Sequence, residues 1–211
     1  MHQAQPRCTL YISVNHNYLR VYQFLRQVGC NFAVNLTSEF MNRTLVLAIG
    51  NAAANIVHTV RKESEHPSLI SARYIFADCN DRSFYIPHLH LDAEGPHFPS
   101  SIFSGFSTVC IVAGMGGETG TKYTEIAARK AVESGARNVI AFVTTPFRFE
   151  GEQRNEQARR AVSRLKKNDA LTVVTFDNNY LCDNHPDMNF LNAFELADHE
   201  IMAVMEGELG Q

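Results

Sequence analysis

The stretch VAGMGGETGTKYTEIAARKA, residues 112–131, contains the most informative change of pattern in this sequence. It begins in an apolar run, passes through four glycines and two threonines, and continues with the spacing of an amphipathic helix. A glycine-rich turn between a buried strand and a helix is typical of parallel α/β sheets. The loops that follow the strands of such a sheet gather at one edge, where ligands bind. The stretch therefore predicts both a fold class and the place of a site.

The same alternation of strand and helix continues on both sides of this stretch. Apolar or alternating runs predict strands over residues 45–50, 71–79, 108–114, 138–147 and 171–176. Helical spacing predicts helices over residues 51–63, 121–135, 151–167 and 188–206, and Gly135 ends the second of these. Residues 80–106, rich in histidine, proline, serine and glycine, are typical of a loop. The pattern predicts an α/β fold, a Rossmann-like three-layer α/β/α arrangement with a mainly parallel sheet.

Two regions are expected along the 211 residues. Residues 1–40 form an N-terminal extension, with a strand predicted at residues 9–14 and a helix at residues 18–28. We expect this extension to pack on the main domain, residues 41–207, which is long enough to bury a core.

Composition excludes several classes of function. A net charge of −3 gives no electrostatic footprint for nucleic acid. Five scattered cysteines without a CxxC pair indicate reduced thiols in a cytoplasmic protein. The N-terminus lacks the pattern of a secretory signal, and no apolar run approaches the ~20 residues that span a bilayer. We therefore expect a cytoplasmic protein that has no membrane span and binds no nucleic acid.

The loop GMGGETGT, residues 114–121, suits a phosphate because glycine lets backbone N–H groups approach an anion closely. Its glycines nearly follow the GxGxxG pattern of dinucleotide-binding loops, but the third lies one position late. It is not a P-loop, since no GK[ST] sequence closes it. Taken alone, the loop leaves a phosphate site and a simple tight turn as open alternatives.

Four segments, in order along the chain, resemble the FtsZ/tubulin family of GTPases. GMGGETGT resembles that family's signature loop GMGGGTGT, and VTTPFRFEGEQRNEQA at residues 143–158 resembles its VTKPFxFEGxxRxxQA. FLNAFELADHEI at residues 190–201 is similar to the start of the long central helix of bacterial FtsZ. LAIGNAAANIV at residues 47–57 is less similar to the family's first loop, VGVGGGGxNAV. Together these segments imply the nucleotide-binding domain of that family.

The resemblance implies a site for GTP or GDP, with or without Mg²⁺. At the phosphate end it implies the glycines and threonines of two loops: Gly50, Gly114, Gly116, Gly117, Thr119, Gly120 and Thr121. It implies that Glu150 and Arg154 reach the ribose and that Asn55 faces the base. A simpler alternative for Glu150 and Arg154 is an i, i+4 surface pair.

The same resemblance implies how the base is recognised. Phe194 would stack on it, and Asp198, one helical turn further, would accept from guanine N1–H and N2–H, which adenine lacks. Asn178 lies near the family's Asn-Asp pair, although the order here is Asp177-Asn178. Two alternatives stay open: Phe194 belongs to an apolar stripe and would be core, and Asp198 would be a solvated helix residue.

The sequence also departs from the family pattern. Asn51 and three alanines, residues 52–54, replace most glycines of the first loop, and Glu118 replaces a glycine of the signature loop. A carboxylate beside phosphates weakens binding by repulsion unless a cation or Lys122 offsets it, so Glu118→Gly is expected to tighten nucleotide binding. The family's catalytic acidic loop and second domain follow its central helix, whereas this sequence ends at Gln211. We therefore expect negligible self-stimulated GTPase activity, and enzyme function stays open.

Three functions remain under consideration. The leading hypothesis is a truncated, divergent guanine-nucleotide-binding domain that serves as a regulatory or interaction module, with itself or an FtsZ-like filament protein as partner. The second is a structural or interaction module whose site has decayed. The third is a dinucleotide-dependent Rossmann-like enzyme, suggested by the glycines together with Glu133. A metal site at His88, His90 and Asp92 has suitable spacing but no evident fourth ligand, so a solvated loop is favoured there.

Overall fold

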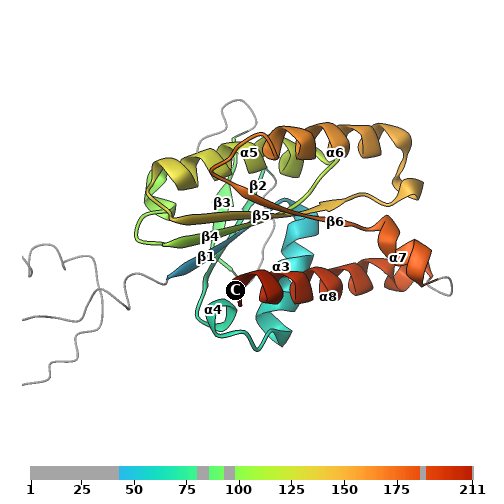
Figure 1. The fold of residues 1–211 in the computed structure, drawn as a ribbon, viewed down its shortest axis with the longest axis horizontal. Coiled ribbons are helices and arrows are strands. Elements are labelled where there is room, and N and C mark those ends of the chain that lie inside the picture. Colours follow the sequence, from blue (N-terminus) through green and yellow to red (C-terminus); the bar gives the residue numbers. More distant parts are fainter. Residues whose placement is uncertain (1–42, 80–85, 93–97, 186–188, 211) are drawn as a thin grey trace, which may run out of the picture. The chain divides into compact units, whose positions relative to one another are not determined.

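A computed structural model describes residues 43–210 except 80–85, 93–97 and 186–188 (Figure 1). The predicted N-terminal extension, residues 1–40, with its strand and helix, lies outside the described residues.

The sheet is parallel throughout and has six strands in the order β3-β2-β1-β4-β5-β6. Its strands are β1 (Thr44–Ile49), β2 (Arg73–Asp78), β3 (His88–His90), β4 (Thr108–Gly114), β5 (Asn138–Thr145) and β6 (Thr172–Asp177). The direction in which strands are added reverses between β1 and β4. In open α/β sheets this reversal opens a crevice at the carboxyl ends of the two strands, where ligands bind.

Helices cover both faces of this sheet (Figure 1). One face carries α3 (Asn51–Glu63), α4 (Pro67–Ile70) and α8 (Phe190–Leu209), and the other carries α5 (Glu118–Glu133) and α6 (Glu152–Leu165). Short helical segments are η1 (Ser100–Ile102), η2 (Arg148–Glu150) and α7 (Asn179–Asn184). The predicted α/β fold class, with a sheet between two helical layers, is confirmed.

The central strands are apolar on both sides because each faces a helical layer. In β1, Leu45, Leu47 and Ile49 join the core under α5 and α6, while Val46 and Ala48 join the core under α3 and α8. All five are at most 1% exposed. Burying a Leu, Ile or Val side chain stabilises the fold by about 1.5–3 kcal/mol, which explains why strands with continuous apolar runs lie in the middle of the sheet.

The boundaries of α5 differ from the predicted helix 121–135. The helix begins three residues earlier, at Glu118, and the backbone of Gly120 in its first turn packs directly on the end of β4. A Cβ added to Gly120 would lie 2.2 Å from the carbonyl oxygen of Gly114. At the other end Gly135 has a φ of +87°, and the N–H of Ala136 donates to the Ala131 carbonyl at 3.2 Å. The last helical residue is Glu133, and the predicted glycine forms the turn that closes the helix two residues later.

The expected loop over residues 80–106 contains regular structure. β3 lies at the edge of the sheet and pairs with β2, with Phe76 opposite His88 and Asp78 opposite His90. η1 follows it, and Phe98 and Phe103 are fully buried. The interpretation as a loop was wrong at these places. A three-residue strand has too little periodicity to be recognised, and its stability comes from pairing with β2.

Candidate functional site

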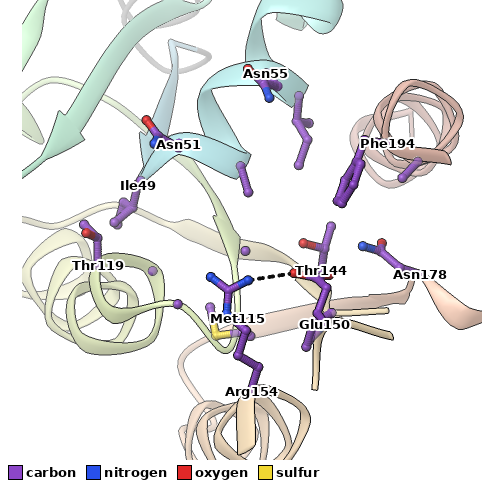
Figure 2. Close-up of a pocket in the computed structure, with 18 of the residues that line it drawn as sticks. Ile49, Asn51, Asn55, Met115, Thr119, Thr144, Glu150, Arg154, Asn178 and Phe194 are labelled. Atoms are coloured by element: carbon purple, nitrogen blue, oxygen red, sulfur yellow. Dashed lines mark hydrogen bonds and ion pairs between the residues drawn. The ribbon is translucent and has the colours of Figure 1, made fainter. Parts of the chain in front are cut away.

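A cavity of about 250 Å³ opens at the carboxyl edge of the sheet, where β1 and β4 end (Figure 2). Its walls come from the first turns of α3 and α5, the ends of β2 and β5, the η2–α6 segment, the end of β6 and the start of α8. Most of the predicted site residues line it: Gly50, Asn55, Gly114, Gly117, Thr119, Gly120, Glu150, Arg154, Asn178, Phe194 and Asp198. Segments far apart in sequence therefore meet in one pocket.

Two helix N-termini form one end of this pocket. Gly50 is the N-cap residue of α3 and Gly117 that of α5, and neither helix has a side-chain cap. The N–H groups of a first helical turn have no partner within the helix, and the helix dipole adds partial positive charge there. Gly50 has a φ of +80°, a conformation that favours glycine. This end of the pocket has the donors and the partial charge that an anion requires.

Gly116 and Thr121, both predicted to wrap the phosphates, do not line the pocket. The Thr121 Oγ1 accepts the N–H of Gly116 at 2.9 Å, so this donor is not available to a ligand. Gly116 has a φ of +88°, and a Cβ there would lie 2.7 Å from the carbonyl oxygen of Arg154. The hydrogen bond between these two residues shapes the loop, and Gly116 allows the loop to pack closely against the start of α6.

Asp78 lines the pocket near the N-terminus of α5, and the sequence did not identify it as a site residue. It ends β2 and is only 2% exposed. Its Oδ1 accepts from the Thr119 hydroxyl at 3.1 Å and from the N–H of Cys79 at 2.8 Å. An acidic residue at the end of a predicted strand was the signal that would have identified it, since the ends of parallel strands share one edge.

Glu118 and Lys122 lie differently with respect to the pocket. Glu118 is exposed at the first position of α5 and lines the pocket. Lys122 does not line it, and its Nζ lies 5.2 Å from the centroid of the Tyr123 ring. Among the described residues, the only cationic side chain in the lining is Arg154. Lys122 was expected to offset the negative charge of Glu118, but it is not among the residues that line the pocket.

The altered first loop still fits closely against the signature loop. Ala52 stands where the family has mainly glycine, and its Cβ would be 2.8 Å from a Cβ added to Gly114. The methyl group of Ala52 thus occupies space that Gly114 leaves open. Asn51 and Asn55 extend from the same part of α3, and both line the pocket (Figure 2).

Glu150 and Arg154 form an ion pair at the side of the pocket (Figure 2). The Glu150 Oε2 accepts from Arg154 Nη1 at 3.0 Å, and its Oε1 accepts from the N–H of Phe147 at 2.9 Å. An exposed i, i+4 pair contributes only about 0.3–0.5 kcal/mol. The two residues do form the i, i+4 pair that the simpler alternative predicts. Both also lie in the wall of the pocket, within reach of a ligand.

Asn178 is the buried polar group whose amide oxygen is unused. The residue is 7% exposed, and its Oδ1 has no hydrogen-bond partner among the described residues. Figure 2 places its side chain at the pocket, at the end where Phe194 lies. The neighbouring Asn179, in contrast, accepts the N–H of Arg148 at 2.7 Å and donates to Asp177 at 2.8 Å. Asn179 therefore builds the turn, while the amide oxygen of Asn178 can accept a hydrogen bond from a ligand.

Phe194 lies at the pocket rather than in the core (Figure 2). Its side chain is 49% exposed, and its ring meets the ring of Phe147 edge to face at 5.2 Å between centroids. The buried stripe of α8 is formed instead by Ala197, Ile201 and Met205. The core interpretation of Phe194 is therefore wrong, because an open aromatic face remains at the mouth of the pocket.

Asp198 lines the same end of the pocket and is half-buried. Burial raises the pKa of its carboxyl to about 7, with a smaller rise from the charge of Glu195 and an opposing effect from His199. Both protonation states are therefore populated near neutral pH. The ionised form can accept two hydrogen bonds from neighbouring donors on a ligand edge.

The two remaining sequence-based sites lie away from this pocket. Glu133 lies at the far end of α5, hydrogen-bonded to Lys130 at 2.7 Å, about 24 Å along a 16-residue helix from the glycine loop. Glu133 is therefore too far from the glycine loop to serve the dinucleotide-dependent enzyme that was considered as the third function. His88 stacks on Phe76 with ring centroids 5.3 Å apart. Within the described part of the chain, no three side chains of histidine, cysteine, aspartate or glutamate group as a metal would require.

Comparisons with known proteins identify a related family. Residues 101–185 match the Tubulin/FtsZ family, GTPase domain. Cell division protein FtsZ 1 of Halobacterium salinarum is 38% identical over 104 residues, which cover 49% of this chain and 26% of that protein. FtsZ of Mycoplasmopsis pulmonis is 39% identical over 95 residues, covering 44% and 24% respectively. The match thus spans about a quarter of the length of these curated relatives.

Solved structures with a similar fold belong to the same group of proteins. An empty FtsZ dimer from M. jannaschii has a TM-score of 0.65 at 20% identity, covering 92% of this chain and 58% of that one. CetZ2 from Haloferax volcanii, solved as a GTPγS-bound protofilament, has a TM-score of 0.64 at 13% identity, covering 79% and 58%. At these identities the likeness establishes the fold. In the described part of the chain, no helix has the length and apolar character needed to cross a membrane.

Proposed function

Because this chain is an FtsZ/tubulin-like protein, we propose that the pocket between β1 and β4 binds a guanine nucleotide, GTP or GDP. The observation that carries the proposal is the division of the pocket into two unlike ends. One end presents the uncapped N-termini of α3 and α5, and the other presents an aromatic ring, a buried amide and a carboxyl. A nucleotide has the same division into phosphates and a base.

The base end favours guanine over adenine. Asp198 in its ionised form accepts two hydrogen bonds, and guanine offers N1–H and N2–H side by side, whereas adenine has an unprotonated N1 at this edge. The unused Oδ1 of Asn178 accepts a further donor, and the half-exposed ring of Phe194 provides a surface for stacking. Leaving a buried donor or acceptor unpaired costs about 1–3 kcal/mol, which gives the pocket its selectivity.

The end of the pocket proposed for the phosphates is better suited to binding a nucleotide than to hydrolysing GTP. The backbone donors of α3 and α5 suit phosphate oxygens, but Glu118 adds a negative charge where the related loops have glycine. We infer that the domain is a regulatory or interaction module with little self-stimulated GTPase activity, acting in the cytoplasm on itself or on an FtsZ-like filament protein. Phosphate release from GTP that rises with protein concentration would contradict this part of the proposal.

Calorimetric titration with GTP, GDP and ATP, each with Mg²⁺, tests the proposed ligand. We expect binding of the guanine nucleotides and at least tenfold weaker binding of ATP, since one lost hydrogen-bonded pair is worth about 1.4 kcal/mol or more. Asp198→Ala is expected to abolish this preference. Glu200→Gln on the same helix, outside the pocket lining, serves as the matched control and should bind as the wild type does.

A second candidate is a structural module whose pocket no longer binds nucleotide. The observation in its favour is the acidic lining, which includes Asp78, Glu118, Glu150 and Asp198 against a single arginine. It predicts that none of the three nucleotides binds in the presence of Mg²⁺. The same titration therefore separates the two candidates.

A further inference from the structure

We propose that this pocket selects the diphosphate GDP over the triphosphate GTP, and that Glu118 is the residue that sets this preference. The inference rests on the proposed function and specifies the ligand of the same site. It arises from the negative charges and the hydrogen-bond donors that the chain itself places at the end of the pocket proposed for the phosphates.

The two helix N-termini at this end of the pocket differ in charge. α3 has no acidic residue in its first turn, so its uncapped N-terminus is open to an anion. α5 begins with Glu118, at a position where a carboxylate interacts favourably with the helix dipole. At α5 the chain thus supplies a negative charge of its own, whereas at α3 that charge must come from a ligand.

Glu118 lies where a phosphate at α5 would come close to it. It is exposed and lines the pocket, and a Cβ added to the preceding residue, Gly117, would meet no atom within 4 Å. The space in front of this turn is therefore open. Arg154 is the only cationic side chain among the described lining residues, and it is already hydrogen-bonded to Glu150 at 3.0 Å. The lining therefore has no further cationic side chain to offset the charge of Glu118.

Two donors of the glycine loop are used within the protein. The N–H of Gly116 donates to Thr121 Oγ1 at 2.9 Å, and the Thr119 hydroxyl donates to Asp78 Oδ1 at 3.1 Å. Neither donor can serve a phosphate oxygen without giving up its bond inside the protein. Asp78, which is 2% exposed, also adds a second carboxyl group to this part of the lining. A third phosphate would therefore add negative charge without gaining these two donors.

The size of the cavity also favours a short ligand. Its volume is about 250 Å³, which is below the roughly 300–1,000 Å³ of most small-molecule pockets. GTP has the same base and ribose as GDP and one phosphate more. In the proposed orientation, that phosphate must be accommodated at the end of the pocket that Glu118 lines. Space and charge thus favour the same nucleotide.

The expected preference corresponds to one additional contact between like charges. Two charges about 4 Å apart interact several times more strongly near a protein surface than in bulk water. Because Glu118 is exposed, water and salt screen much of this repulsion. We expect GTP to bind at least about tenfold more weakly than GDP, which corresponds to about 1.4 kcal/mol.

The test is calorimetric titration with GDP and GTP at one Mg²⁺ concentration, repeated with the non-hydrolysable β,γ-imido analogue of GTP. Glu118→Gln removes the charge with little change of shape, so it should tighten GTP binding and reduce the GDP preference several-fold. Glu125→Gln, two turns along α5 and outside the lining, is the matched control and should keep the wild-type preference. Thermal melting verifies that each variant is folded. Added salt should reduce the preference in the wild type and less so in Glu118→Gln, because it screens the repulsion.

The outcomes separate this inference from the proposed function. Equal affinities for GDP and GTP in the wild type, or tighter binding of GTP, would overturn the selectivity. A preference for GDP that is unchanged in Glu118→Gln would overturn the role of Glu118. Both results would leave the guanine-nucleotide site intact. Absence of binding by GDP and GTP alike would instead overturn the proposed function itself.

Discussion

Single residues in this pocket act through their protonation state as much as through their position. The carboxyl of Asp198 has a pKa raised to about 7 because it is half-buried in the wall of the pocket. In the proposed site, recognition of guanine needs the ionised form, so binding near neutral pH would require part of the population to release a proton. Affinity and proton release are thus coupled at this residue.

From this coupling we predict that the affinity for GDP rises as the pH increases through about 7. The sign follows because the carboxylate is the binding-competent form and is depleted at lower pH; the bound nucleotide donates to it and lowers its pKa. Calorimetry in two buffers of different ionisation enthalpy should detect the released proton. Asp198→Asn should bind with little pH dependence in this range, and an unchanged pH slope in that variant would assign the titration to another group.

Elements meet in this fold at points where a side chain cannot be accommodated. Gly120, in the first turn of α5, lies against the carbonyl of Gly114 at the end of β4, and an added Cβ would be 2.2 Å from that oxygen. Gly117, three residues earlier, has no neighbour within 4 Å of an added Cβ and a φ of −88°. The two glycines therefore have different roles within one loop.

We predict that Gly120→Ala destabilises the protein by about 1–3 kcal/mol, since α5 must move away from β4 to accommodate the methyl group. Gly117→Ala is the comparison variant: alanine is a poorer N-cap residue than glycine by about 0.5–1 kcal/mol, so this variant should lose less stability than Gly120→Ala. Urea unfolding monitored by circular dichroism measures both. Equal stability of the two variants would show that the loop relaxes without cost and that the close contact is not a constraint.

The sequence predicts the central strands well, but it predicts the edge strand and the roles of single loop residues poorly. β1, β4 and β5 are buried on both faces, so their apolar runs are long and unambiguous. β3, with three residues at the sheet edge, depends on pairing with β2 and leaves little local pattern. Gly116 and Thr121 could not be separated from the pocket-lining residues, because only the folded loop determines which N–H groups are satisfied internally. The position of Asp78 at the end of a predicted strand indicated the edge of the sheet, but its contact with Thr119 of α5 appears only in the folded structure.

At the scale of the whole domain, residues from both helical layers and from the sheet line the pocket. Its lining extends from Ile49 at the end of β1 to Asp198 in α8, and it includes the last residue of β2 and residues that follow β4, β5 and β6. The family match covers residues 101–185, whereas α3 and α8, which contribute Asn55, Phe194 and Asp198, lie outside it. A ligand in the pocket therefore connects the matched segment to the rest of the fold.

We predict that GDP with Mg²⁺ raises the melting temperature of the protein, because a ligand that binds only the folded state stabilises it. At a concentration of about 100 times Kd the gain is about 2.7 kcal/mol. ATP with Mg²⁺ is the ligand control and should produce a much smaller shift. Phe194→Ala is the protein control: its ring is 49% exposed, so the ligand-free melting temperature should change little while most of the GDP-dependent shift is lost. A shift that persists in this variant would mean that the base does not stack on Phe194, because stacking is the contact that the substitution removes.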